Sequence, residues 1–214
     1  MKIVLNFLVF CTIVFMVYMC WGAIYGPKGP LQFEKAQKSR EEAIKTRLMD
    51  IRKAQIEYKN RKGEFAGSWE DLSKFLNEEK LPFVIKIGSL TDELMEKGIT
   101  TEEKAVKAGL IKRDTMWVLA KDTLFGRNFD PSVLAFVPVE GIDAKFTLDT
   151  ATITSGSGYT VKVFESAVLY DTYLGDLQRQ LLINLKDRAS KLERYPGLRV
   201  GSVKEINNNA GNWE

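Results

Sequence analysis

Hydrophobic and polar positions divide the chain into an apolar N-terminal segment and a longer part with mixed, periodic patterns. From Ile3 to Tyr25 nearly every residue is apolar, and Asn6 and Thr12 are the main polar interruptions. A helix needs about 20 apolar residues to cross the hydrocarbon core of a membrane. The pattern therefore predicts an N-terminal transmembrane helix, which ends where glycine and proline residues follow Tyr25.

The alternatives for this segment are a cleaved signal peptide and a lipoprotein signal. A signal peptide has a shorter apolar stretch and small residues at positions −3 and −1 of the cleavage site. Only a cut after Gly22, with Cys20 at −3, is tolerable, and Met19 before Cys20 fits a lipobox poorly. We therefore expect a retained anchor. Its C-terminal end carries the aromatic residues typical of the headgroup layer, namely Tyr18, Trp21 and Tyr25.

A long amphipathic helix is predicted from Leu31 to Lys62, because this stretch is rich in helix-forming residues and contains no glycine or proline. One narrow stripe repeats along it at alternating spacings of four and three: Ile44, Leu48, Ile51, Gln55 and Tyr58. We expect the stripe to pack on the sheet of the same chain. A coiled coil with a partner remains the alternative, although it would need three or four clean heptads.

The rest of the chain predicts short helices and an antiparallel sheet, so the fold class is α+β. Capping boxes at 68–71, 100–103 and 202–205 indicate helix starts, and further helices are expected at 91–98 and 177–192, with a strand possible near 181–183. Strands are expected at 83–87, 115–120, 133–139, 144–154 and 159–165. The last two are separated by Ser155-Gly156-Ser157-Gly158, which predicts a hairpin turn.

These elements divide the chain into four parts. Residues 1–26 form the transmembrane anchor, 27–62 the linker and amphipathic helix, 63–206 the α+β domain, and 207–214 a polar tail. We expect the tail to be loosely held unless the indole of Trp213 finds a pocket. The other tryptophans of this domain, Trp69 and Trp117, are expected to pack in the core.

Composition removes several classes of function. Histidine is absent, and the two cysteines, Cys11 and Cys20, both lie in the apolar segment. The commonest general base and metal ligand, thiol nucleophiles and disulfides are thus missing from the rest of the chain. The net charge is +3 with both signs interleaved, which does not favour nucleic-acid binding. The glycine-rich turn at 155–158 lacks the lysine and helix of a phosphate loop.

Two catalytic possibilities remain after these exclusions. One is a Ser–Lys pair at Ser89 and Lys86, and the other is a carboxylate site drawn from Asp149, Glu165 and Asp171. Neither has a diagnostic spacing. We therefore predict no catalytic residues, no cofactor, no metal site and no enzymatic activity.

Residues 47–76, with the matching positions Ile51, Ala54, Tyr58, Gly63, Phe65 and Leu72, resemble the exposed half of a type IV pilin or type II secretion pseudopilin helix. The resemblance implies an apolar half-helix in a membrane or filament core, followed by an amphipathic half, a short helix and an antiparallel sheet. The leader glycine and the glutamate near the start of mature pilins are absent. The segments YPGLRVGS and NNNAGNWE also resemble uncharacterised single-pass bacterial envelope proteins.

Together these observations predict a non-enzymatic envelope protein, pilin-like in layout, that acts as a scaffold or assembly partner. It would be single-pass in the inner membrane with a periplasmic domain, although the count of lysine and arginine beside the anchor favours the opposite orientation. A membrane-anchored hydrolase and a periplasmic ligand-binding module are the alternatives. We expect the lipid bilayer and a protein partner or second copy as partners, but no nucleic acid. Possible partner contacts are Ile44, Leu48, Ile51, Tyr58 and Trp213.

Overall fold

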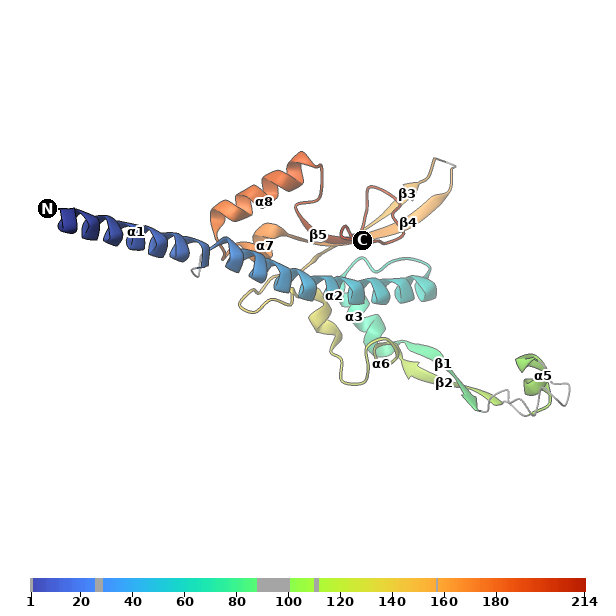
Figure 1. The fold of residues 1–214 in the computed structure, drawn as a ribbon. Helices are drawn as coiled ribbons and strands as arrows, with labels where there is room; N and C mark the ends of the chain where they lie inside the picture. The colour runs from blue at the N-terminus through green and yellow to red at the C-terminus, as the bar shows by residue number, and fades with distance from the viewer. Residues whose placement is uncertain (1, 26–28, 88–100, 110–111, 157) are drawn as a thin grey trace. The chain divides into compact units, whose positions relative to one another are not determined.

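The computed structural model describes residues 2–25, 29–87, 101–109, 112–156 and 158–214 of an α+β chain (Figure 1). The side chains of 2–8, 22–25, 83–87, 102 and 112–114 lie outside this description. The chain divides into two compact units. The first unit combines Met1–Trp69 with Ser132–Glu214, the second unit is Glu70–Pro131, and each is described by itself.

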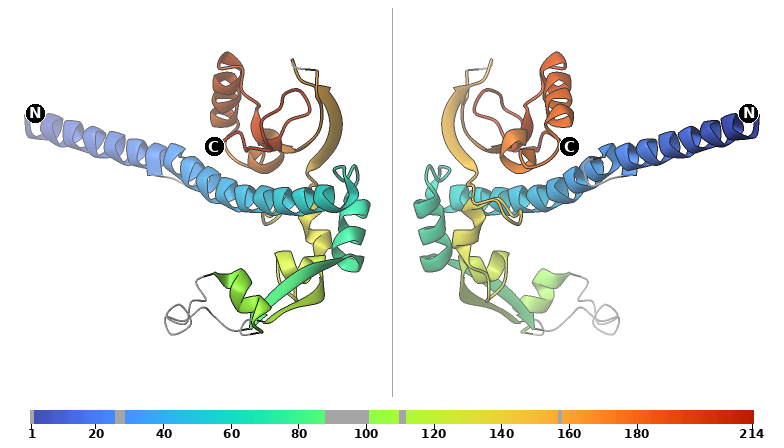
Figure 2. Two further views of the ribbon diagram at one scale, coloured as in Figure 1. Left: turned by 90° about the vertical axis from the view of Figure 1, so that its right-hand side faces the viewer. Right: turned by 90° about the vertical axis from the view of Figure 1, so that its left-hand side faces the viewer.

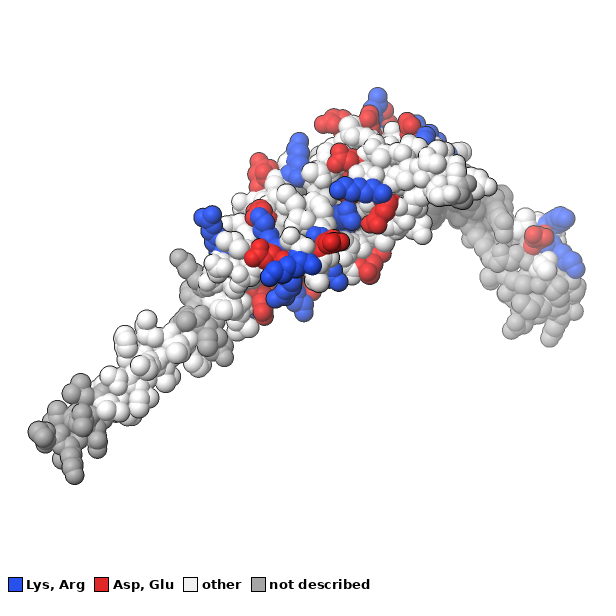
Figure 3. Space-filling view, turned by 90° about the horizontal axis from the view of Figure 1, so that it is seen from above, with Lys and Arg blue, Asp and Glu red and all other residues white. Residues whose placement is uncertain are grey.

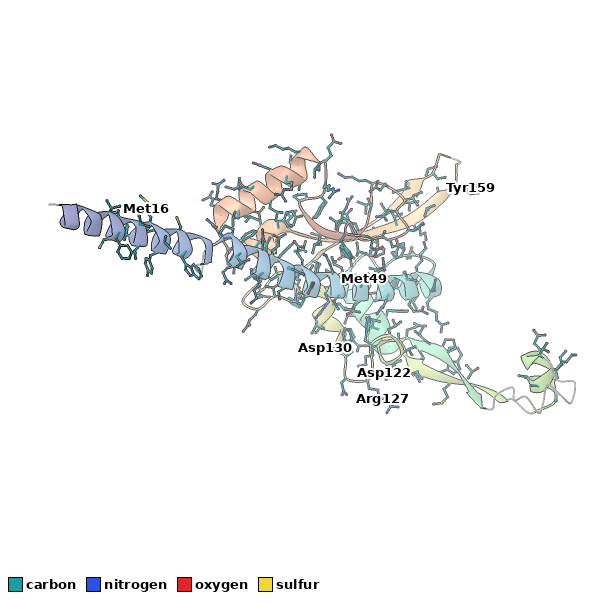
Figure 4. All side chains as sticks on the ribbon, in the orientation of Figure 1. Met16, Met49, Asp122, Arg127, Asp130 and Tyr159 are labelled. Atoms are coloured by element: carbon teal, nitrogen blue, oxygen red, sulfur yellow. The ribbon has the colours of Figure 1, made fainter. Side chains whose placement is uncertain are left out.

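The apolar N-terminal segment forms helix α1 (Lys2–Tyr25). Every residue from 9 to 21 is exposed, including Tyr18 at 74% and Trp21 at 64%. Met16, labelled in Figure 4, projects from this helix in the same way. Within the residues that the structure describes, no helix meets the length and apolarity required of a membrane span.

The predicted long helix is confirmed as α2 (Pro30–Lys62). It begins after Gly29 with a proline at its first position, where the missing amide hydrogen costs nothing. It ends at Gly63, which adopts the left-handed conformation at φ 77° and donates its amide hydrogen to the carbonyl oxygen of Lys59 at 2.8 Å.

The stripe along α2 packs inside the chain. Ile44, Leu48 and Ile51 have no exposed surface, while Tyr58 is half-buried. The polar member of the stripe, Gln55, is also fully buried, and its amide exchanges two hydrogen bonds with the backbone of Ala66, at 2.9 and 3.0 Å. Since α2 packs against the strands of its own unit, the expected packing on the chain's own sheet is confirmed for the buried residues.

That sheet contains β3 (Thr147–Thr154), β4 (Thr160–Leu169) and β5 (Gly197–Gly201) in the antiparallel order β3-β4-β5. The predicted hairpin joins β3 to β4, and the amide of Ser155 donates to the carbonyl of Tyr159 at 2.8 Å. Tyr159 lies at the tip of this hairpin (Figure 4). The strand predicted at 159–165 is shorter than the observed β4, which continues to Leu169.

The helix predicted at 177–192 is observed over 179–191, so the alternative of a strand near 181–183 is wrong. Helix α7 (Tyr170–Leu174) follows β4 directly, and α8 (Arg179–Lys191) buries Leu182 and Ala189. The sheet and α8 lie on the same side of α2 in both views of Figure 2 and in Figure 1.

The strand predicted at 133–139 is wrong. Residues Pro131–Ala135 instead form a 3-10 helix, η1, and only Phe136 forms an isolated bridge with Lys145. Proline supports a helical first turn, and Pro138 cannot donate to a sheet ladder. The apolar residues that suggested a strand are buried nevertheless, namely Leu134, Ala135 and Val137.

The capping box at 202–205 does not begin a helix. The hydroxyl of Ser202 accepts hydrogen bonds from the amides of Lys204 and Glu205, at 3.2 and 3.3 Å, but the described residues that follow form turns. A serine cap and a local serine turn use the same hydrogen bonds, so the motif alone cannot separate them.

The second unit contains most of α3 (Trp69–Glu78) and an antiparallel ribbon of β1 (Lys80–Ile87) and β2 (Lys112–Leu119), followed by α6 (Ala120–Leu124). Helix α5 (Glu102–Lys107) is capped by Thr101, whose hydroxyl accepts from the amide of Lys104 at 3.4 Å. The predicted cap at Thr100 is therefore displaced by one residue. The helix expected at 91–98 lies outside the described residues.

Candidate functional site

A pocket of about 260 Å³ lies in the first unit where α2, α8, the segment before β5 and the C-terminal tail meet. We call it the tail pocket. Its wall contains charged residues from α2 and α8, three aromatic residues and the end of the tail. These charged and aromatic residues are Glu41, Lys45, Tyr170, Arg188, Arg194, Tyr195 and Trp213.

The tail forms one side of this pocket because it is bound to β5. The amide of Gly201 donates to the carbonyl of Ala210 at 3.0 Å, and Gly211 bridges Val200. The Asn212 side chain accepts from the amide of Arg199 at 3.1 Å and donates to the carbonyl of Gly197 at 2.9 Å. The tail is therefore held in place by its backbone pairing with a strand, and its indole lies in a pocket wall, which is the exception that the sequence analysis allowed.

The indole of Trp213 packs over the backbone of Gly211. A Cβ atom added to Gly211 would lie 2.5 Å from Cζ2 of Trp213, so the close approach requires glycine at this position. Trp213 is half-buried and keeps part of its surface open to the tail pocket. This residue was singled out by its terminal place in the sequence, and the structure puts it in the wall of a pocket.

Positive charge predominates around the tail pocket. Lys45, Arg188 and Arg194 line it, together with one carboxylate, that of Glu41. Glu41 accepts a hydrogen bond from the Gln37 amide at 2.7 Å and one from the Tyr173 hydroxyl at 3.4 Å, and it lies 4.0 Å from the amine of Lys45. Among the described residues, Arg188 and Arg194 form no ion pair.

The tyrosines beside the pocket remain protonated. Burial raises the pKa of Tyr170, and the charge of Glu41 adds to that increase, while Arg194 opposes it. Burial, followed by the charge of Glu165, raises the pKa of Tyr195. The neutral phenols can donate hydrogen bonds to an anion at the pocket.

The carboxylates proposed from the sequence do not form one site. Asp149 and Glu165 are opposite each other in the β3–β4 register, but the nearest partner of Glu165 is Arg199, at 3.3 Å. Arg199 also binds Glu205 at 3.4 Å, whereas Asp171 pairs with Lys186 at 2.5 Å. The contacts of Arg199 form a partly buried ion-pair group and Asp171–Lys186 is an exposed pair, and ion pairing is an ordinary structural role of such residues.

The Ser–Lys alternative falls outside the description of the structure. Ser89 is among the residues that the structure leaves out, and Lys86 is placed in β1 by its backbone alone. In the described part of the chain, no group of three or more acidic, cysteine or histidine residues could bind a metal ion.

Two further tryptophans behave differently from each other. Trp69 is half-buried and its indole donates to the carbonyl of Phe146 at 3.2 Å. Trp117 on β2 is 59% exposed, so the expectation that it packs in the core is wrong.

The charged side chains seen in Figure 3 are of both signs and intermixed, in agreement with the low net charge.

Sequence reasoning missed Arg188, Arg194 and the two pocket tyrosines, because they are separated along the chain and no spacing motif connects them. The adjacent pair Arg194 and Tyr195 before a Pro-Gly turn is the one local signal that could have been followed.

No protein-family model matches the chain, and comparisons with curated proteins and with solved structures give no significant match either.

Proposed function

We propose that this chain is a non-enzymatic, membrane-anchored envelope protein, pilin- or pseudopilin-like in layout, that serves as a scaffold or assembly partner. The observation that supports the proposal is the exposure of apolar side chains along α1. Such a surface is unfavourable in water and requires an apolar environment around the helix.

The exposed apolar side chains of α1 surround the helix. Successive residues of a helix differ in direction by about 100°, so the consecutive exposed residues from Ile13 to Met19 cover all faces. Residues 9–21 of α1, whose side chains the structure describes, include no charged residue and appear without coloured atoms in Figure 3. A helix that is apolar all round is buried either in lipid or among other apolar helices.

The order of elements supports the pilin-like part of the proposal. An apolar helix precedes a long amphipathic helix, whose buried stripe packs on an antiparallel sheet of the same unit. We place the anchor in the inner membrane as a single span with the domain in the periplasm. The bilayer is then one partner, and a protein or a second copy of the chain is the other.

Membrane extraction tests the anchor. The full-length protein should remain in the membrane pellet after carbonate washing, and its intact mass should include the N-terminal segment. Replacing both Val14 and Phe15 by lysine should release it, because each central lysine costs about 2.5–3.5 kcal/mol on insertion scales. The same replacement by lysine at Leu31 and Ile56, two exposed apolar residues of α2, should not release the protein from the membrane. A wild-type protein that lacks its first 20-odd residues, or that washes off the membrane, would overturn the anchor.

Reporter fusions test the orientation. Alkaline phosphatase fused to the C-terminus should be active, and a cytoplasmic reporter at the same place should not. The reverse result would move the domain to the cytoplasm, as the lysine and arginine count favours.

The absence of catalysis has its own test, since alanine at both Ser89 and Lys86 should leave cellular function intact. A folded but inactive double variant would make a Ser–Lys enzyme the better explanation.

A further inference from the structure

We propose that the tail pocket and the crevice that continues from it along α8 bind an acidic segment of a partner protein, with a carboxylate at Arg188 and Arg194 and an apolar side chain farther along α8. The inference deepens the proposed function, because it names the chemistry of the partner that an assembly role requires.

The tail pocket contains more positive than negative charge. Three cationic side chains face one carboxylate in the tail pocket, and that carboxylate already accepts hydrogen bonds from Gln37 and Tyr173. Arg188 and Arg194 are exposed and have no acidic partner among the described residues. An arginine binds a carboxylate through two parallel hydrogen bonds, so the pair favours a carboxylate ligand over a cationic or neutral one.

Aromatic side chains form part of the wall of the tail pocket. Tyr170, Tyr195 and Trp213 line the same pocket, and each combines an apolar ring with a polar group. Aromatic residues and arginine are enriched where protein interfaces gain most of their energy. The tail that carries Trp213 is fixed to β5, so the indole is positioned before a ligand arrives and little ordering is needed on binding.

The tail pocket is extended by a neighbouring crevice. A second crevice of about 160 Å³ continues along α8 and shares Leu185 and Arg188 with the tail pocket. Its wall contains the apolar residues Phe33 and Leu181 and, at the end formed by α2, the carboxylate of Glu34. An elongated path with positive charge in one part and apolar residues in the other suits an extended peptide. Glu34 would repel a second acidic residue there, so an acidic residue at the arginines and an apolar residue at the other end of the path are expected.

Fluorescence polarisation with a defined probe tests this proposal. The probe is a fluorescein-labelled peptide, Gly-Glu-Glu-Phe-Gly, titrated with the full-length protein in an uncharged detergent. Binding should weaken as salt is raised, because the attraction is electrostatic. The double variant Arg188→Ala/Arg194→Ala should bind at least about ten-fold more weakly, and Trp213→Ala should also weaken binding. The matched control is Lys191→Ala, an exposed basic residue of α8 that does not line either crevice, and it should bind as wild type.

Three results would overturn the inference. The first is no binding of the probe at millimolar protein. The second is a loss of binding in the Lys191→Ala control as large as in the double variant, and the third is equal binding of a peptide with lysine in place of glutamate. Competition by inorganic phosphate as effective as unlabelled peptide would indicate a small-anion site instead. Arginine-dependent binding of vesicles containing anionic lipid, without peptide binding, would indicate a membrane contact. The extraction and reporter experiments do not involve these arginines, so the proposed anchor and the peptide site can fail separately.

Discussion

Arg40 of α2 forms a bidentate ion pair with Asp176, a residue of the turn between α7 and α8. Its Nη1 donates to Oδ1 at 2.5 Å and its Nη2 donates to Oδ2 at 2.7 Å. The same Nη1 also donates to the carbonyl of Tyr173 at 2.7 Å. The guanidinium thus connects the long helix to the turn from which α8 begins.

Replacing Arg40 by lysine should lower the free energy of unfolding by about 0.5–1.5 kcal/mol, because an ammonium cannot reproduce the planar set of hydrogen bonds. Hydrogen bonding by Arg40 lowers the pKa of Asp176, so its contribution is complete above the usual aspartate pKa and is lost as the pH falls through the lowered value. The difference between variant and wild type should therefore shrink below about pH 4. Thermal denaturation of the full-length protein in detergent measures this difference in stability. The exposed Lys38→Ala control should unfold as wild type does.

Leu48→Ala should destabilise the protein by about 2–5 kcal/mol, as is usual when a fully buried leucine is truncated. The measurement is again the melting temperature, compared with Ile56→Ala on the exposed side of the same helix. Equal melting of Leu48→Ala and wild type, together with loss of a co-purified partner, would turn the stripe into an interface.

Gly201→Ala should prevent stable folding, whereas Gly63→Ala should cost about 1–2 kcal/mol. Both glycines have φ above +70°, which costs an alanine about that much by itself. A Cβ atom on Gly63 would meet no neighbour, but one on Gly201 would overlap the carbonyl oxygen of Phe164 on the paired strand β4. Soluble yield and circular dichroism of the detergent-purified variants distinguish the two. Similar behaviour of the two variants would contradict the close strand approach.

Deleting residues 207–214 should lower the melting temperature, because the deletion removes the backbone pairing that covers β5 and the ion pair between Arg52 and Glu214 at 2.8 Å. Trp213→Ala retains that pairing and should melt closer to wild type, while still weakening peptide binding. Hydrogen exchange of the β5 amides checks the difference. Full protection of β5 in the deletion variant would show that the tail is not required there.

Raising the pH above about 10 should destabilise the protein through Tyr173. Burial, aided by the charge of Glu41, raises the pKa of this fully buried phenol. A raised pKa contributes stability that is present below the unfolded value near 10 and is lost as the pH rises, since ionisation is then possible only on unfolding. Melting as a function of pH should show a smaller alkaline decrease in Tyr173→Phe. The exposed Tyr159→Phe should keep the wild-type profile.

The helices and the hairpin could be read from the sequence because their signals are local. Glycine at position 63 ends α2 by its access to positive φ, and the absence of glycine and proline before it lets the helix run without interruption. Ala151 and Ile153 alternate with exposed threonines, as the half-buried face of a strand does, whereas Leu148 lies three residues before Ala151 and falls outside that alternation. In each case neighbouring residues contain the whole of the information.

The errors arose where one local pattern is compatible with two structures. Residues 133–139 are apolar enough for a strand, but Pro131 before them and Pro138 among them favour a 3-10 turn that buries the same side chains. Ser202 forms the hydrogen bonds of a helix cap without a helix, because only tertiary packing decides whether the following residues continue.

The sequence by itself determined the apolar segment, the long helix, its buried stripe and the lack of histidine and of cysteine beyond that segment. Only the tertiary structure decided that the tail pairs with β5, since backbone hydrogen bonds to Gly201 and Arg199 leave no trace in side-chain pattern. It also decided that Arg188 from α8 and Trp213 from the chain terminus line one pocket. Their meeting depends on chain reversals between them, and no periodicity along the chain encodes a contact of that kind.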